Sequence, residues 1–542
     1  MPLDVQREEY IKSDYGLVYM GSHQNISRRP WLYGQYEPGV LEACLQLLQV
    51  SPQHLSDKRK DYILRADPVY LSRVICAMVN CNDDLGILLG RWQDSYEDGV
   101  SPTAWGGSAD ILRLWASSNC SPVRYGQCWV FASVLCTVMR VLGIPSRVVT
   151  VFNAAHDSDG NLSIEEYYSS TGEKLNLTKD SVWNFHVWVE CWMRRSDLTE
   201  EFDGWQVVDP TPQEKSAGVF RCGPCPVAAI QRHCLRVPHD TAFIYASVDA
   251  DIIRLIVHNG RVVGRTVDTE CVGQLIYTKR INSDAPENLT QAYKGKRRYR
   301  PVSYLRSSGW DDSGQGTELN APMAPSLEVS LDLDKVPSLG DSITMCVTLT
   351  NRSGGPRILQ EHVDAQLKEY NSNPQQSFWR THKEVHVQPG QVLQLHHTIP
   401  SAQYETVLAG EDIVNIAVVM LDTRTKERFL ATQEFSLGAP QITVRIEGGD
   451  SIQLRKECTA QVSFSNPFTH VLKGALLTVE GSGLLQGKRE ARKLLLQPGE
   501  EIGEEVSIRA TSPGTKLLMA TFSHSNTSRI VSRIFHKVSV TE

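Results

Sequence analysis

Apolar residues recur at three- and four-residue steps from Cys128 to Leu142, so the pattern predicts a helix with one apolar face. Gly143 and Pro145 follow directly, and a glycine with a proline close behind it is typical of a helix end. The same spacing predicts further helices over 41–48, 69–79 and 107–117.

Other stretches are rich in β-branched and aromatic residues, and they predict strands over 145–152, 182–192 and 204–209. Helices followed by strands within one stretch favour an α+β core like the papain-type fold. From about Pro325 onward the apolar positions alternate in short runs separated by turn residues. This second pattern predicts two small antiparallel β-barrel or sandwich domains of roughly 100 residues each.

A change in amino-acid composition separates the core from these β domains. The run from Lys294 to Arg300 is basic, and the residues after it are polar and glycine-rich, so we interpret the stretch as a solvated linker. The chain is thus expected to be a multidomain protein with an α+β papain-like core. Its expected divisions are a linker remnant at 1–20, a catalytic core at 21–293, a linker at 294–324, and β domains at 325–436 and 437–542.

The composition excludes several classes of protein. The 542 residues are 41% hydrophobic and 22% charged, which is ordinary for a globular protein. A formal net charge of -7 argues against a general nucleic-acid binder. The N-terminal residues lack the apolar segment of a secretion signal, and the longest apolar run is too short to cross a bilayer. We therefore expect no integral membrane segment.

The cysteine content indicates the compartment. Thirteen cysteines without a secretion signal predict free thiols in a reducing compartment, and hence a cytoplasmic protein, with export by an unconventional route left open. Asn-x-Ser/Thr sequences occur at several positions, among them Asn25, Asn161, Asn176, Asn288, Asn351 and Asn526. We expect these asparagines to stay unmodified in that compartment.

Cys128 stands at the start of the predicted helix. The N–H groups and the positive dipole end found there favour the thiolate, which is the nucleophilic form of cysteine. The alternative is a buried core cysteine, as we expect for Cys136. Two residues further along provide candidate partners, namely His186 within a predicted strand and Asp209 at the end of the next.

Each partner has an ordinary structural explanation when it is taken alone. His186 would suit a hydrogen-bonded core position, and an Asp before a proline, as Asp209 is, commonly forms a turn. Together the three residues give cysteine, histidine and aspartate in chain order, which is the arrangement of a cysteine acyl-transfer triad.

The sequences around these three residues resemble the animal calcium-dependent transglutaminases, the protein-glutamine γ-glutamyltransferases. They are Gly-Gln-Cys128-Trp-Val-Phe, Trp183-Asn-Phe-His186-Val-Trp and Gly204-Trp-Gln-Val-Val-Asp209-Pro-Thr-Pro-Gln-Glu. The resemblance implies that Cys128 is the nucleophile, His186 the acid and base, and Asp209 the orienting carboxylate. It also implies that Trp92, in Gly90-Arg-Trp92, helps to bind the oxyanion. Trp92 and Trp183 either line a tunnel for an amine or are ordinary core residues, and the sequence leaves both open.

The same resemblance implies the reaction. Cys128 would form a thioester with the side chain of an accessible protein glutamine, and a lysine side chain or polyamine would take the acyl group to give an isopeptide crosslink. If water takes the acyl group instead, the enzyme is a glutamine deamidase or thiol hydrolase on the same triad. A non-catalytic scaffold is a further alternative, because the β-sandwich that normally precedes the core in this family is not found in the sequence given.

A loop of alternating oxygen-bearing side chains predicts a calcium site. Asp157, Asp159, Asn161 and Ser163 occupy every second position, and oxygen ligands suit Ca²⁺, although such a run is as often a polar turn. The resemblance implies that these four residues bind calcium together with Asp180. It implies a second site at Ala77, Asn80, Asn82 and Asp84, largely through carbonyl groups. For a third site only Asp249 matches, since Tyr293-Lys-Gly-Lys-Arg-Arg replaces the stretch that precedes two glutamates in the family.

Regulatory residues are implied in the same way. Tyr370 resembles a family tyrosine that bonds the catalytic cysteine in the resting enzyme. Cys81 and Cys222 match positions that form inactivating disulfides in a relative, and Cys222 could also pair with Cys225. Asn25 stands where that relative has a phenylalanine that binds guanine nucleotide, so nucleotide binding is not expected.

Overall fold

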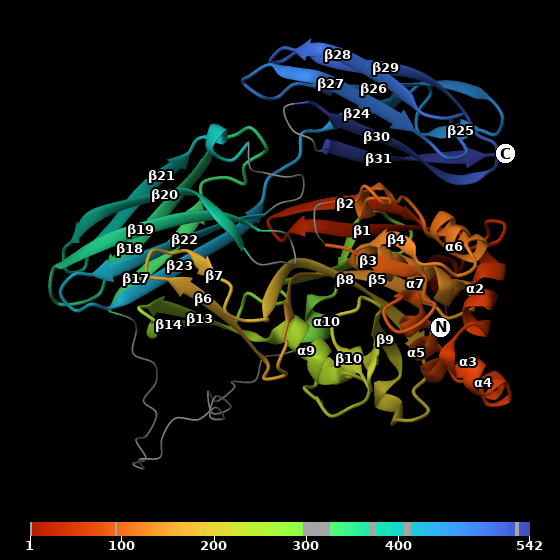
Figure 1. Ribbon diagram of the computed structural model, residues 1–542, viewed down its shortest axis with the longest axis horizontal. Helices are drawn as coiled ribbons and strands as arrows, with labels where there is room; N and C mark the ends of the chain where they lie inside the picture. Colours follow the sequence, from red (N-terminus) through yellow and green to blue (C-terminus); the bar gives the residue numbers. More distant parts are fainter. Residues whose placement is uncertain (1–2, 93–94, 296–325, 369–373, 406–412, 526–529) are drawn as a thin grey trace.

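The computed structural model describes residues 3–92, 95–295, 326–368, 374–405, 413–525 and 530–542. A mixed helical and β core occupies one side of the molecule, and two β domains lie along it (Figure 1). The core therefore has the predicted α+β class, and the two domains after it have the predicted antiparallel β architecture.

The helices α2 to α7 lie at one end of the core, and α9 and α10 lie nearer its middle (Figure 1). The helix bounds are α1 Asp4–Arg7, α2 Val40–Gln49, α3 Pro52–Ser56, α4 Lys58–Leu64, α5 Pro68–Val79, α6 Ser108–Ser117, α7 Cys128–Val141, α8 Val227–Gln231, α9 Thr241–Asp249 and α10 Thr290–Lys294. Local sequence explains where α5 begins, because the Asp67 side chain accepts the N–H of Val69 and Pro68 occupies the first turn. Residues 128–140 of α7 are all buried, so this helix is enclosed on every side rather than on the one face that its spacing predicts.

A six-stranded sheet lies against α7. In spatial order its strands are β12 Cys222–Pro226, β9 Gly204–Asp209, β8 Ser181–Met193, β5 Ser146–His156, β15 Leu275–Lys279 and β16 Pro286–Asn288. Three short pairings accompany it, between β3 Leu88–Gly90 and β4 Val123–Gly126, between β10 Lys215–Ser216 and β11 Val219–Phe220, and between β1 Tyr15–Ser22 and β2 Asn25–Leu32. The predicted helices and strands of this region are all present.

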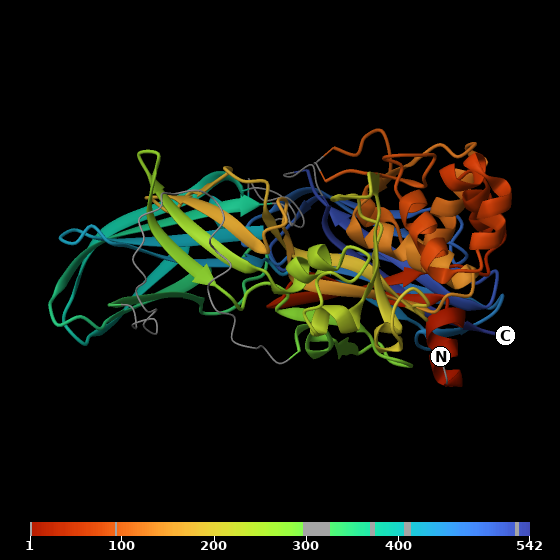
Figure 2. The ribbon, with the colours of Figure 1, turned by 90° about the horizontal axis from the view of Figure 1, so that it is seen from below.

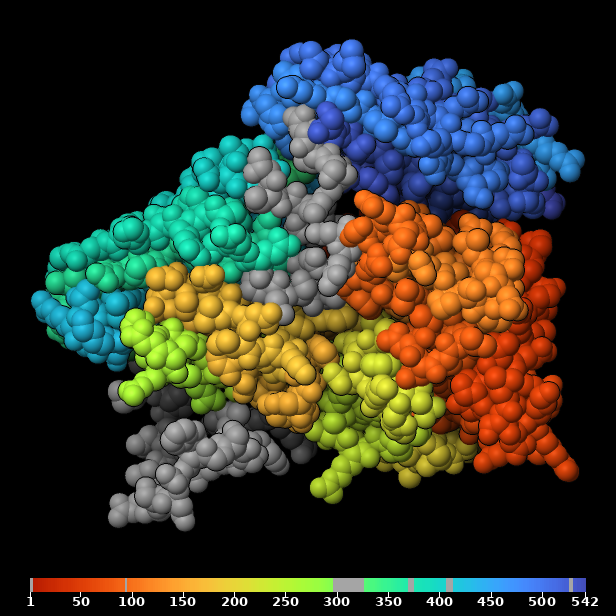
Figure 3. Space-filling model, in the orientation of Figure 1, coloured from red at the N-terminus to blue at the C-terminus, as the bar shows by residue number. Residues whose placement is uncertain are grey.

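The sheet extends into an arm that the sequence pattern did not reveal. Its strands are β14 Arg261–Asp268, β13 Asp251–His258, β6 Ser163–Ser169 and β7 Lys174–Leu175, with β13 parallel to β6. Tyr168 and Ile256 of the arm pack with Val419 and Leu430 of the first β domain. Figures 2 and 3 show this arm lying directly against the first β domain.

The N-terminal hairpin corrects one predicted boundary. β1 Tyr15–Ser22 pairs with β2 Asn25–Leu32, and the residues of β1 are almost all buried in the main core cluster. The core therefore begins within the stretch 1–20, and not at residue 21 as the sequence predicts. The second β domain lies over this hairpin (Figure 1), and Arg29 stacks on Phe535 with its guanidinium 4.4 Å from the ring centre.

Each β domain contains two packed sheets, and their strands are antiparallel except for one parallel pair at the edge of a sheet in the second domain. The first domain has β17 Leu327–Leu333, β18 Ile343–Asn351 and β21 Val392–Ile399 in one sheet, and β20 Pro374–Val387, β19 Arg357–Lys368, β22 Ile413–Asp422 and β23 Arg428–Ser436 in the other. The second has β24 Ile442–Ile446, β26 Glu457–Ser465 and β29 Glu501–Arg509, facing β25 Ser451–Gln453, β31 Ile530–Thr541, β30 Gly514–Ser523, β27 Leu472–Glu480 and β28 Arg489–Leu496. Apolar residues of both sheets form one core in each domain.

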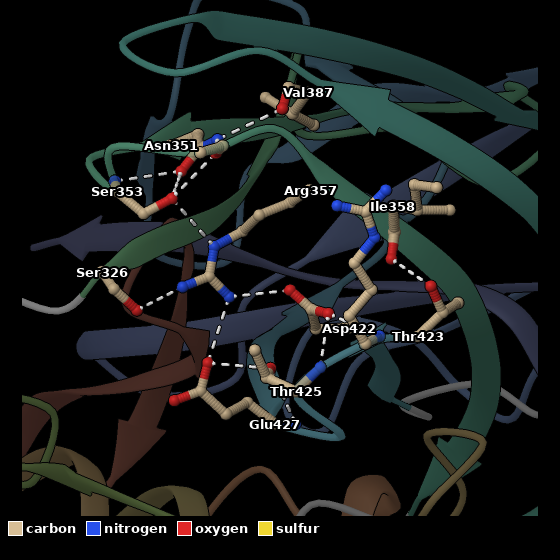
Figure 4. Close-up of polar contacts among 12 residues, drawn as sticks. Ser326, Asn351, Ser353, Arg357, Ile358, Val387, Asp422, Thr423, Thr425 and Glu427 are labelled. Carbon is tan, nitrogen blue, oxygen red and sulfur yellow. Dashed lines mark hydrogen bonds and ion pairs between the residues drawn. The ribbon is translucent and has the colours of Figure 1, made fainter.

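Each β domain has a buried asparagine whose side-chain amide donates to backbone carbonyl groups, an arrangement that we call the asparagine corner. Asn351 donates from Nδ2 to the carbonyl groups of Gly355, Val387 and Gln388 (Figure 4). Asn466 makes the equivalent bonds in the second domain, to the carbonyls of His470 and Leu496. Nearby, the buried Arg357 guanidinium pairs with Asp422 and Glu427 and donates to Ser326, which fixes the start of the first domain (Figure 4).

None of the helices in the described part of the chain is long and apolar enough to cross a membrane.

Candidate active site

Cys128 is the first residue of α7, and its side chain is fully buried. The first turn of a helix leaves N–H groups without an intrahelical acceptor and carries the positive end of the dipole. The sequence therefore places the sulfur where a thiolate, or an oxyanion formed beside it, is stabilised. α7 packs against β8, the strand that carries His186.

His186 and Asp209 form a buried pair across neighbouring strands. β8 and β9 are antiparallel, and His186 Nε2 lies 2.6 Å from Asp209 Oδ2. Burial lowers the pKa of His186, but the charge and hydrogen bond of Asp209, helped by Cys128, outweigh it and raise the pKa to about 10. The ring is therefore held as imidazolium at neutral pH. Because Asp209 engages Nε2, Nδ1 is the nitrogen left to exchange a proton with Cys128.

Three aromatic residues form a row that leads to His186. Phe131 stacks on Trp92, Trp92 lies 6.5 Å from Trp183 between ring centres, and Trp183 meets the His186 ring edge-on at 4.8 Å. Trp183 donates its indole N–H to Ser181 Oγ. Gly90 makes room for Trp92, since a Cβ at Gly90 would lie 2.6 Å from a carbon of the Trp92 ring. The structure thus brings both predicted tryptophans to the histidine.

Asp209 is held by further donors. Its Oδ1 accepts the N–H of Thr211 at 3.0 Å, and its Oδ2 accepts Nε2–H of Gln213 at 3.0 Å. Cys76 donates its thiol to the backbone carbonyl of Asp209 at 3.2 Å. Neither Gln213 nor Cys76 was identified from the sequence, although Gln213 stands within the Asp-Pro-Thr-Pro-Gln motif.

The predicted calcium loop joins the end of β5 to β6. Oxygen atoms of Asp157, Asp159 and Asp180 lie within 4.8 Å of one another, and these three are the one group of this kind among the described residues. Burial and the neighbouring Asp159 raise the pKa of Asp157, so a cation would relieve the repulsion. Asn161 and Ser163 lie in the same loop, where Ser163 N–H donates to Asn161 Oδ1. The donor set consists of oxygens and suits a hard cation such as Ca²⁺.

The second predicted site lies in the loop after α5. Ala77 is near the end of that helix, Asn82 donates its N–H to Asn80 Oδ1, and Asn80 Nδ2 donates to the Phe220 carbonyl. Asp84 Oδ1 is buried and has no hydrogen-bond partner within the described part of the chain. Burial and Asp83 raise the pKa of Asp84 to about 7, as expected for a carboxylate placed where a cation would satisfy it.

An ammonium group faces the residue predicted for the third site. Lys294 Nζ lies 3.7 Å from Asp249 Oδ1 and donates to the Val272 carbonyl, and Tyr245 OH donates to Asp249 Oδ2. Asp249 thus already has a positive neighbour that belongs to the chain.

The predicted regulatory residues are placed in part. Tyr370 lies outside the described residues. Cys222 is buried, and its N–H donates to Cys76 Sγ at 3.5 Å, while Cys81 is half-buried in a neighbouring loop. Burial holds the pKa of the Cys222 thiol well above its usual value. All thirteen cysteines lie in the described residues, and no disulfide joins any two of them. Asn25 donates from Nδ2 to the Ser436 carbonyl, where the two β domains join.

Comparison with known proteins agrees with this arrangement. Residues 111–210 match the model of the transglutaminase-like superfamily, and residues 442–536 match that of the transglutaminase family C-terminal Ig-like domain. Protein-glutamine gamma-glutamyltransferase 5 of Homo sapiens is 38% identical over 523 residues, which cover 91% of this chain and 72% of the relative. Protein-glutamine gamma-glutamyltransferase 2 of Gallus gallus is 40% identical over 490 residues, covering 89% and 70%.

A solved structure matches at the level of the whole chain. The crystal structure of red sea bream transglutaminase superimposes with a TM-score of 0.83 at 34% identity, covering 100% of this chain and 79% of that one. With a buried histidine–aspartate pair beside a cysteine at a helix start, the chain belongs to the transglutaminase family of enzymes.

Proposed function

We propose that this enzyme is a calcium-dependent protein-glutamine γ-glutamyltransferase that forms isopeptide crosslinks. The observation that carries the proposal is the 2.6 Å contact between His186 Nε2 and Asp209 Oδ2, in a ring whose other nitrogen faces the nucleophile position at Cys128. Its substrates are proteins with an accessible glutamine, and its acyl acceptors are lysine side chains or polyamines. Its place of action, in this proposal, is the cytoplasm.

The first half-reaction uses the negative charge of the Cys128 thiolate and the proton of the His186 imidazolium. The Cys128 thiolate attacks the γ-carboxamide carbon, and the oxyanion is bound by the Cys128 N–H and the Trp92 indole N–H, each such donor contributing about 3–4 kcal/mol. The C–N bond then breaks as His186 gives its proton to the departing ammonia, which leaves a thioester. Thioester formation consumes the thiolate charge, and since that charge helps to raise the pKa of His186, the ring becomes a weaker base.

In the second half-reaction the neutral His186 removes a proton from the attacking amine. The amine nitrogen bonds to the acyl carbon and the C–S bond breaks to release the Cys128 thiolate. The amine proton stays on His186, so the thiolate–imidazolium pair is restored. Asp209 keeps Nε2 protonated throughout, so Nδ1 alone changes its state. The aromatic row of Trp92 and Trp183 would exclude water from the thioester and so favour the amine.

Calcium would be held by Asp157, Asp159, Asn161, Ser163 and Asp180, with a second ion near Asn80, Asn82, Asp84 and the Ala77 carbonyl. The ion supplies positive charge that offsets the clustered carboxylates. Asp180 directly precedes β8. A cation bound to Asp180 would therefore fix the start of the strand that carries Trp183 and His186.

Labelled cadaverine incorporation into a glutamine-containing protein, with and without calcium, tests the proposal. Wild-type enzyme should incorporate the amine only with calcium, Cys128→Ala should incorporate none, and Asp209→Asn should lose turnover on the order of 10⁴-fold. Glutamate formation without amine incorporation would assign the enzyme to the deamidases. No reaction of either kind would leave a scaffold function.

A further inference from the structure

The side chain of Gln213 reaches back to the carboxylate that serves His186. Its Nε2 lies 3.0 Å from Asp209 Oδ2 and 3.2 Å from His186 Nε2. The same Oδ2 accepts the 2.6 Å bond from His186. Two donors therefore share one carboxylate oxygen in the centre of the site.

The sequence explains why Gln213 occupies this position. β9 ends at Asp209, and the two prolines that follow, Pro210 and Pro212, have no N–H groups and cannot continue a strand ladder. Thr211 gives its N–H to Asp209 Oδ1, so the chain turns at once and returns Gln213 to the carboxylate. The next residue, Glu214, points elsewhere and pairs with His156 at 3.0 Å.

Chemistry fixes which end of the amide faces Asp209. The carboxylate accepts hydrogen bonds only, so the amide presents its NH₂ group, and a carbonyl oxygen there would repel Oδ2. The contact between Gln213 Nε2 and His186 Nε2 joins two donors and is therefore not a hydrogen bond. The amide thus weakens the hold of Asp209 on the imidazolium while it fixes the carboxylate in place.

We propose that Gln213 is a positioning residue of the acyl-transfer reaction, one that orients Asp209 and withdraws part of its negative charge from His186. This inference rests on the proposed function. The charged or titratable groups that act on His186 are Asp209 of β9 and Cys128 of α7, and Cys76 of α5 contacts only the backbone carbonyl of Asp209. Gln213 is uncharged, and it acts on these groups through its hydrogen bond to Asp209 Oδ2.

Removal of the amide should make the imidazolium a weaker acid. In Gln213→Met, Asp209 Oδ2 would accept from His186 alone, so the ring would keep its proton to higher pH and give it up less readily to ammonia. General acid–base catalysis contributes roughly 10²–10⁴-fold, and we expect a partial loss of it, on the order of tenfold in kcat, with KM for the glutamine substrate unchanged. Gln213→Glu places a second carboxylate at the same point, which should raise the pKa of His186 further.

Two readouts test the inference on full-length, calcium-loaded enzyme. The first is kcat and KM for ammonia release. The second is the pH dependence of Cys128 alkylation by iodoacetate, an anionic reagent whose rate falls along the alkaline limb of the profile when His186 loses its proton and positive charge. For Gln213→Met and Gln213→Glu we expect kcat to fall and the limb to move to higher pH. Gln46→Met is the matched control, since Gln46 is also a half-buried glutamine that donates to a side chain, Cys120, away from Asp209.

The outcomes separate the two proposals. Wild-type kcat and an unmoved alkaline limb in Gln213→Met, with a melting temperature like that of wild type, would overturn the role of Gln213 and leave the proposed function intact. Wild-type enzyme that releases no ammonia from glutamine would overturn the proposed function. The alkylation profile needs no substrate, so it decides the role of Gln213 in that case too.

Discussion

Lys368 Nζ, at the end of β19 in the first β domain, donates to the backbone carbonyl of Val182, the residue before Trp183 in β8. The same ammonium lies 2.6 Å from Glu434 and is buried. A charged group of the β domain therefore bonds directly to the strand that carries the candidate active site.

Replacement of Lys368 by Met should loosen the first β domain on the core. The Val182 carbonyl would lose a charged donor, at a cost of about 1.5–3 kcal/mol. Since Cys128 is fully buried, we expect iodoacetamide to label it several-fold faster in the calcium-free variant than in calcium-free wild type. Lys335→Met, which removes an exposed lysine of the same domain, is the control, and equal labelling rates in all three proteins would disprove the coupling.

The His186–Asp209 pair should make stability depend on pH in a defined window. The pKa of His186 is raised from 6.5 to about 10 in the folded protein, so the pair stabilises the fold fully below about pH 6.5. This stabilisation is lost as the pH rises towards 10. The gap in melting temperature between wild type and Asp209→Asn should therefore be widest near pH 6 and should narrow by pH 10. A gap that stays constant or widens would contradict the assignment.

Gly90→Ala should damage catalysis more than folding. The new Cβ would lie 2.6 Å from a Trp92 ring carbon, and Trp92 is half-buried and has room to move. Displacement of the nominated oxyanion donor should lower kcat by roughly 10²-fold while the melting temperature changes little. The chosen comparison is Gly354→Ala, because its backbone is not left-handed and no described atom beyond its chain neighbours lies within 4 Å of the new Cβ. Equal kcat values for Gly90→Ala and wild type would remove Trp92 from the oxyanion site.

Calcium binding should depend on the loop after β5. Asp157→Asn together with Asp159→Asn removes two of the three clustered carboxylates, so one binding event should disappear from a calorimetric titration and calcium-dependent activity should fall with it. Asp332→Asn, at an exposed position in β17, should leave the titration unchanged. Retention of every binding event in the double variant would locate the ion elsewhere.

Asp249 should behave differently from those carboxylates. Lys294 already lies beside it, so Asp249→Asn should leave the number of bound calcium ions unchanged, and the total should be smaller than three. Calorimetry that shows three comparable events in wild type, one of them lost in Asp249→Asn, would contradict this expectation.

Much of the site could be predicted because its residues occupy regular elements. The apolar spacing, with Gly143 and Pro145 behind it, placed Cys128 at a helix start, and β-rich runs placed His186 and Asp209 on strands. Contacts made by long side chains across the chain could not be predicted this way. Gln213 reaches Asp209 through a turn, and Lys368 reaches Val182 from another domain, so neither leaves a periodic signal.

The arm of β13 and β14 escaped prediction for a related reason. Ile256 packs against Val419 and Leu430 of the first β domain as well as Tyr168 of the arm, and many of its neighbours in the two strands remain exposed. A strand pattern that depends on a partner far along the chain resembles a loop when read alone. The apolar spacing of α7 likewise predicts one buried face, whereas the helix is buried on every side. Its polar residues can be buried because they bond within the core, as Arg140 does to the Ser146 carbonyl.

The asparagine corner of the first β domain restricts where carbohydrate can be attached to the chain. Asn351 begins an Asn-x-Ser sequence, yet its amide nitrogen supplies three carbonyl groups and the side chain has no exposed surface. A sugar attached there would take the place of an amide hydrogen and force a bulky polar group into a closed sandwich. Carbohydrate on Asn351 and a folded first β domain are therefore mutually exclusive, and a chain that acquired the sugar during synthesis would be unable to close this domain.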